Sequence, residues 1–141
     1  MDVPILVAVI SAAASIIVAA GTFFLTKRKE REAEWRTQRL QHYREFLEAL
    51  SGTVGTDSTP EGQLRWAKAC NTIGLVASQN VLKALWQFQD AIAKSNPQPS
   101  VKEHDRCLNL LILAIRVDLR VSPQDDPSTF AFRLWASGTN G

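Results

Sequence analysis

The sequence predicts an all-α protein: one N-terminal transmembrane helix continuing into a cytoplasmic antiparallel four-helix-type bundle, with a short C-terminal helix. Two observations predict this fold class. Residues 3–26 contain no charged side chain. The rest of the chain repeats apolar residues at intervals of three and four, without sustained strand alternation. We therefore divide the 141 residues into a transmembrane anchor (1–26), a charged juxtamembrane stalk helix (27–39) and a helical bundle (40–141).

The uncharged segment is long enough to cross a bilayer. Its 24 residues, Val3 to Thr26, make a helix of about 36 Å, and a hydrocarbon core is about 30 Å thick. A cleaved signal peptide carries basic residues before its apolar run, whereas this basic cluster follows the run and comprises Lys27, Arg28, Lys29 and Arg31. The positive-inside rule then predicts a single-pass protein with the N-terminus outside and residues 27–141 in the cytoplasm.

Small residues follow one side of this predicted span. They recur at intervals of three and four and comprise Ala8, Ser11, Ala12, Ser15, Ala19 and Thr22. Such a face lets two membrane helices approach closely. An alanine-rich anchor without a partner explains the same composition.

Helix start and stop signals divide the remaining chain. We expect one helix from the membrane to about residue 50, with Gly52 as a left-handed cap, and a second from Thr59-Pro60 to about residue 75. A third should cover about 79–94 after Ser78, and a fourth should start at the capping box of Ser100. Asp126-Pro127 predicts a short last helix that holds Phe130, Leu134 and Trp135. The residues expected to face inward on the first four are Leu40, Tyr43, Phe46, Leu47 and Leu50; Leu64, Trp66, Ala67, Cys70 and Ile73; Val81, Leu82, Leu85, Trp86, Phe88 and Ile92; and Leu108, Leu111, Ile112, Ile115 and Leu119.

Motifs for catalysis are missing from the sequence. There is no glycine-rich phosphate loop, no HExxH and no GxSxG. His104 and Cys107 share a helix face and could form a thiolate–imidazolium pair, but a solvated first turn beside a buried cysteine explains them better. Together with His42 and Cys70 they offer four possible zinc ligands, but without the two close ligand pairs of a structural site. We therefore expect no enzyme activity, no metal and no cofactor.

The strongest charged feature follows the predicted span. Residues 27–44 hold seven basic and three acidic residues, which favours contact with anionic lipid headgroups. Nucleic acid is disfavoured, because glutamates dilute this cluster and the whole chain has a net charge of only +2. All four tryptophans lie beyond the span and are the candidate interface residues: Trp35, Trp66, Trp86 and Trp135.

Three segments carry a resemblance to known proteins. The stretches EREAEWRTQRLQHYREFLEALSG, VASQNVLKALWQFQDAIAKSNPQPS and DPSTFAFRLWASG resemble a group of small bacterial proteins that have one membrane anchor and no assigned function. The resemblance spans nearly the whole chain. It implies a bacterial source and an inner-membrane location, and it brings no catalytic motif or ligand.

Two functions are compatible with these features. The first is a membrane-tethered helical module that oligomerises or binds another protein at the cytoplasmic face, using the small-residue face and the 40/43/47/50 stripe for self-association. The alternative is a membrane-perturbing effector, of the toxin or phage-defence type, that acts through clustered transmembrane helices. The sequence does not identify a partner, an oligomer number or a trigger.

Overall fold

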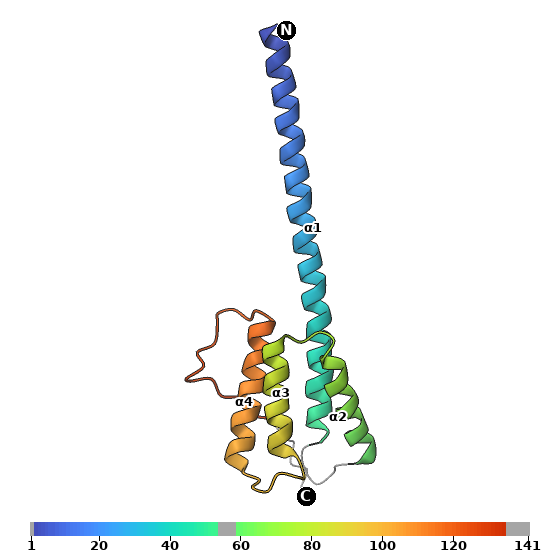
Figure 1. Cartoon of the computed structure of the whole chain (residues 1–141), viewed down its shortest axis with the longest axis vertical. Coiled ribbons are helices and arrows are strands. Elements are labelled where there is room, and N and C mark those ends of the chain that lie inside the picture. The colour runs from blue at the N-terminus through green and yellow to red at the C-terminus, as the bar shows by residue number, and fades with distance from the viewer. Residues whose placement is uncertain (1, 54–58, 135–141) are drawn as a thin grey trace, which may run out of the picture. The chain divides into compact units, whose positions relative to one another are not determined.

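A computed structural model describes residues 2–53 and 59–134. This part of the chain is helical, without strands, and contains α1 (Val3–Ser51), α2 (Pro60–Ile73), α3 (Gln79–Ile92) and α4 (Val101–Asp118), which are labelled in Figure 1. Contacts divide the chain into two units, Met1–Gln38 and Arg39–Gly141. The all-helical prediction is confirmed for the described residues.

The first unit consists of the N-terminal part of α1. The sequence predicted that the apolar helix continues past residue 27 to about residue 50, and the structure has one helix from Val3 to Ser51. Pro4 lies in the first turn, where its missing N–H costs no intrahelical bond. Glutamate–arginine and glutamate–lysine pairs follow residue 26 at helical spacing, which supports the continuation of the helix.

The second unit has one hydrophobic core, built from all four helices. α3 and α4 lie side by side and run in opposite directions (Figure 1). The buried side chains of the cluster are Tyr43, Phe46, Leu50, Ile73, Val81, Leu85, Phe88, Cys107, Leu108, Leu111, Ile112 and Ile115. Eleven of the twelve were expected to face inward from the apolar periodicity, and Cys107 was expected as a buried cysteine beside the first turn of its helix. The periodicity therefore located most of the core.

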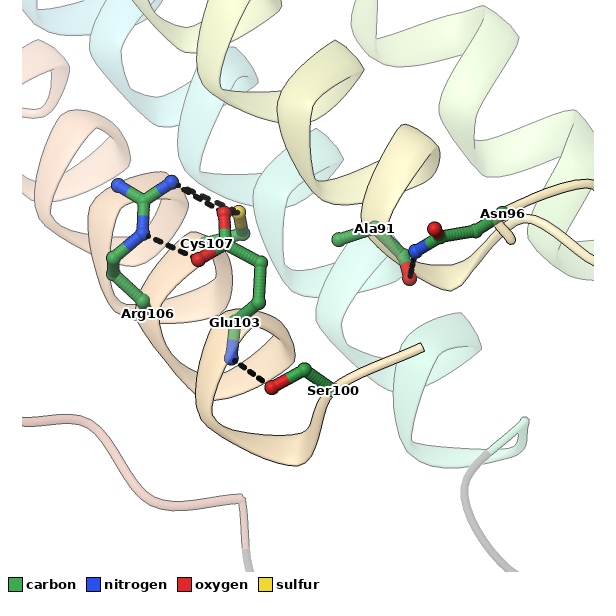
Figure 2. Close-up of polar contacts among 6 residues, drawn as sticks. All are labelled: Ala91, Asn96, Ser100, Glu103, Arg106 and Cys107. Atoms are coloured by element: carbon green, nitrogen blue, oxygen red, sulfur yellow. Dashed lines mark hydrogen bonds and ion pairs between the residues drawn. The ribbon is translucent and has the colours of Figure 1, made fainter. Parts of the chain in front are cut away.

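The helix starts follow the predicted caps. The hydroxyl oxygen of Thr59 accepts a hydrogen bond from the N–H of Gly62 at 3.0 Å, with Pro60 as the first residue of α2. Ser100 accepts from the N–H of Glu103 at 3.4 Å at the start of α4 (Figure 2). Ser78 precedes α3 as predicted, but its side chain makes no capping hydrogen bond.

Several apolar residues expected in the core are exposed. Leu64 on α2 is 73% exposed because the ring of Trp66, on the other side of that helix, packs against the core instead. On α3 the buried positions 81, 85 and 88 turn Trp86 and Ile92 outward, and Leu40 is also exposed. Gly52 takes no left-handed conformation, which corrects its predicted role as a cap.

The predicted last helix does not form within the described residues up to 134. Asp126 caps only a single turn, in which its side chain accepts hydrogen bonds from the N–H and hydroxyl of Ser128. The following residues, 130–134, have no regular secondary structure, and the N–H of Phe132 donates to the side-chain oxygen of Asn109 on α4 at 2.7 Å. Phe130, Phe132 and Leu134 pack on the core from this segment. Trp135 lies outside the described residues.

Candidate functional site

The N-terminal part of α1 is the most apolar surface of the described chain. By length and composition this helix could cross a membrane, and none of the residues in its most apolar 18-residue window is buried. A signal sequence would share the same length and composition. Exposed apolar patches of this extent mark contact with a membrane or another apolar surface.

The small residues predicted to form a packing face are all exposed on α1: Ala8, Ser11, Ala12, Ser15 and Ala19, with Thr22 in the same row. The hydroxyl of Ser15 donates to the carbonyl oxygen of Ser11 at 2.9 Å. Because that hydrogen bond lies within the helix, the hydroxyl proton of Ser15 is already used. The face therefore offers close backbone approach more than a polar link between helices.

The basic cluster lies on α1 directly after the apolar segment. Nζ of Lys27 contacts Oε2 of Glu30 at 2.8 Å, and Nε of Arg28 contacts Oε1 of Glu32 at 3.3 Å. The described residues give Lys29 and Arg31 no ion pair. These exposed i,i+3 and i,i+4 pairs stabilise the helix only slightly.

The four tryptophans have different environments. Trp35 and Trp86 are exposed, at 45% and 56%. Trp66 is partly buried: its ring packs on Phe46 with centroids 5.0 Å apart and meets Phe88 edge-on at 6.4 Å. Of the described candidates, Trp35 and Trp86 are therefore exposed to solvent in part, and Trp66 packs against the core.

His104 and Cys107 lack the electrostatics of a catalytic pair. The His104 ring packs on Phe88 with centroids 5.3 Å apart. Cys107 is buried, and its Sγ contacts Oε1 of Glu103 at 3.5 Å (Figure 2). Burial, and then the Glu103 carboxylate, raise the pKa of the Cys107 thiol. This opposes formation of the thiolate, which is the nucleophilic form.

Glu103 is instead occupied by an arginine. Its carboxylate receives two hydrogen bonds from Arg106, at 2.6 and 2.9 Å (Figure 2). These bonds lower the pKa of Glu103 to about 2. The Glu103 carboxylate therefore stays ionised at neutral pH, and its ion pair with Arg106 lies in the first two turns of α4.

The remaining titratable side chains considered as site residues either lie apart from one another or form ion pairs. Across the described residues, no three histidine, cysteine or acidic side chains gather as metal ligands, so His42 and Cys70 do not join the pair on α4. Asp125 binds Arg116 through two hydrogen bonds, at 2.6 and 3.0 Å. That bridge holds the pKa of Asp125 below its usual range.

The structure reveals a polar cluster that the sequence analysis missed. Asp118, at the C-terminal end of α4, accepts a hydrogen bond from the Tyr43 hydroxyl and contacts Nη1 of Arg39 at 3.3 Å. Its side chain is only 7% exposed. The only sequence signal is an acidic residue in the last turn of an apolar helix, where the helix dipole disfavours it unless it has partners.

The 40/43/47/50 stripe is also engaged within the chain. Tyr43 and Leu50 are buried in the core of the second unit, and Leu47 packs against that core. Three of its four side chains therefore contribute to the core of the second unit, whereas Leu40 is exposed.

Comparisons with models of known protein families, with curated proteins and with solved structures find no match to this chain. The resemblance to small bacterial anchored proteins therefore gains no support from them. The function has to be inferred from the geometry of α1 and of the helices that follow it.

Proposed function

We propose that this chain is a membrane-tethered helical module, in which α1 crosses the bilayer once. The helices from Arg39 onward form an antiparallel bundle on the cytoplasmic side, and the small-residue face supports self-association. One observation carries this proposal: the uncharged segment Val3–Thr26 is helical and exposed. Its twelve Val, Ile, Leu and Phe residues favour insertion by about 4–7 kcal/mol in total.

The proposed orientation rests on charge. Lys27, Arg28, Lys29 and Arg31 follow the segment directly, whereas only Asp2 is charged before it. Basic residues near a span are retained on the cytoplasmic side. Two cysteine variants test this with a membrane-impermeant maleimide in intact cells. Asp2→Cys should react without permeabilisation, and Leu64→Cys, at an exposed site of α2, only after it.

The orientation test also distinguishes a cleaved signal sequence. Loss of an N-terminal tag from the mature protein, together with release from membranes at alkaline pH, would contradict the anchor. Labelling of Leu64→Cys in intact cells would contradict the orientation alone. The wild-type chain is the control for background labelling of Cys70 and Cys107.

Self-association is tested by the mass of the full-length protein extracted with native lipids. We expect a discrete oligomer that dissociates in the Ser15→Leu/Ala19→Leu variant, because leucine keeps the backbones apart. Ala13→Leu/Ala20→Leu adds the same volume on another side of α1 and should leave the mass unchanged. A wild-type monomer, or equal effects of the two variants, would contradict the proposed face.

The alternative function, a membrane-perturbing effector, makes a different prediction. No residue between 3 and 26 is ionisable, so the segment offers no charged group to line a conducting path. Overexpression should therefore leave the membrane potential intact. Depolarisation that depends on Ser15 and Ala19 would favour the effector over the tethered module.

A further inference from the structure

One side of α1 combines aromatic and basic side chains immediately after the apolar segment. Phe24, Arg28, Arg31 and Trp35 follow one another at intervals of four, three and four residues, which places them on the same side of a helix. All four are exposed, with Phe24 at 76%. We name these four residues the aromatic–arginine face.

The side chains of this face border a surface hollow. It has a volume of about 810 Å³ and is lined by the aromatic–arginine face together with Phe23, Lys27 and Glu32. Along the helix, the two arginines lie between Phe24, at the end of the apolar segment, and Trp35, further into the stalk. Its size is in the range of ligand sites, and its lining is both apolar and cationic.

The charges of the hollow favour an anion. Three cations line it against one carboxylate, that of Glu32. That carboxylate contacts Arg28 through Nε at 3.3 Å, and Lys27 is directed to Glu30. The described residues offer Arg31 no hydrogen bond or ion pair. A guanidinium matches the geometry of phosphate oxygens by donating two parallel hydrogen bonds.

We propose that the aromatic–arginine face binds one anionic phospholipid, with its phosphate between Arg28 and Arg31 and its acyl chains along Phe24 and the preceding apolar segment. The chain continues without interruption from an uncharged segment into this face, so the ligand needs an apolar tail as well as a negative charge. This inference rests on the proposed membrane insertion of α1.

The depth along the helix agrees with such a ligand. Arg28 and Arg31 lie two and five residues beyond Thr26, or about 3 and 8 Å along the axis. The headgroup layer extends about 5–8 Å beyond each side of the hydrocarbon core. Trp35, about 13 Å beyond Thr26, then lies about 5 Å outside that layer, on its aqueous side.

The test compares two double variants of the full-length protein. Arg28→Gln/Arg31→Gln removes two charges from the face. Lys29→Gln/Arg36→Gln removes two charges from other sides of the same helix and is the matched control. Each protein is placed in phosphatidylcholine nanodiscs with increasing phosphatidylglycerol, and the retained phosphatidylglycerol is counted by native mass spectrometry.

We expect the wild type to retain phosphatidylglycerol in preference to phosphatidylcholine. The apparent Kd should rise roughly tenfold to thirtyfold in Arg28→Gln/Arg31→Gln, since each basic residue near an anionic surface contributes about 1 kcal/mol. It should rise at most about threefold in the control pair, whose charges act only at a distance. Arg28→Lys/Arg31→Lys keeps the charge but loses the planar guanidinium groups. Its apparent Kd should lie between those of the wild type and of Arg28→Gln/Arg31→Gln.

Two results would overturn the inference. If both glutamine pairs weaken phosphatidylglycerol binding equally, only diffuse charge attracts the lipid. If the wild type shows no preference for phosphatidylglycerol over phosphatidylcholine, the face does not bind an anionic phospholipid. Neither result contradicts the proposed membrane anchor, provided that the protein stays embedded in the nanodisc and resists alkaline extraction. A wild type that fails to embed would instead refute the proposed function, and the inference with it.

Discussion

Tyr43 is the only tyrosine of the chain, so its ionisation can be followed by itself. The side chain is buried in the core, and its hydroxyl donates a hydrogen bond to Oδ2 of Asp118. Burial disfavours the tyrosinate, and the hydrogen bond and the negative charge of Asp118 disfavour it further. Together they raise the pKa of Tyr43 well above its ordinary value of about 10.

The perturbation is Asp118→Asn, followed by the absorbance of tyrosinate as the pH is raised. In the folded wild type we expect Tyr43 to ionise only well above its ordinary pKa, whereas the chain unfolded in denaturant should titrate near 10. Asparagine removes the charge but leaves the burial. The pKa of Tyr43 should therefore fall toward 10 in the variant without reaching it.

The same group gives a pH dependence of stability. Because the pKa of Tyr43 is higher in the folded state, its contribution is complete below about pH 10 and is lost as the pH rises through the folded value. The free energy of unfolding should fall by up to about 1.4 kcal/mol per pH unit in that window. Tyr43→Phe should remove this part of the slope, as measured by chemical unfolding in detergent micelles. Ionisation near pH 10 in the folded wild type would refute the reasoning.

Three further outcomes follow from the contacts of the second unit. Phe88→Ala should lower the free energy of unfolding by about 3–5 kcal/mol, because Phe88 is buried in the core. Trp86 is exposed on the same helix, so Trp86→Ala should lower it by under about 1 kcal/mol. Comparable losses in the two variants would contradict the core assignment. Thr59→Ala should cost about 1 kcal/mol in the same assay, because it removes the cap of α2, and Ser78→Ala, which removes no capping bond, should cost far less. Cys107 should react with iodoacetamide more slowly than a model thiol at neutral pH, since its pKa is raised, and mass spectrometry of the labelled protein checks this.

Helix starts were predictable because their signals are local. The bond that caps α2 joins Thr59 to Gly62, and the bond that caps α4 joins Ser100 to Glu103, each three residues apart. Such contacts involve only neighbouring residues, so the spacing of residues in the sequence is enough to predict them. The position of Ser78 was also predicted, but whether its hydroxyl reaches the backbone depends on a side-chain torsion that spacing does not specify.

Helix orientation was predictable only where a single apolar face exists. On α2, Leu64 and Trp66 lie on different sides, so either could have been the inward residue. The packing of the Trp66 ring on Phe46 decided between them. The prediction of a short last helix was wrong for a similar reason. The backbone of Phe132 contacts Asn109, 23 residues earlier, and local sequence signals do not predict such a contact.

The aromatic–arginine face was only partly predictable. Its basic residues and Trp35 were identified from the sequence, but the predicted boundary between anchor and stalk separated them from Phe24. Once α1 continues through that boundary, the intervals of four, three and four place all four residues on one side. The hollow that they border depends on how their side chains lie, which the spacing alone does not give.

The sequence by itself determined the uncharged segment, the helical character of the described chain and most of the core positions. These follow from composition and from a period of 3.6 residues, which require no knowledge of distant contacts. Only the tertiary structure decided that Tyr43 meets Asp118 and that the 40/43/47/50 stripe packs inside the second unit. The contact of Tyr43 with Asp118 joins residues 75 positions apart, and the stripe packs against residues of the three later helices. They depend on which helix faces cover one another, a choice made by packing the whole core at once.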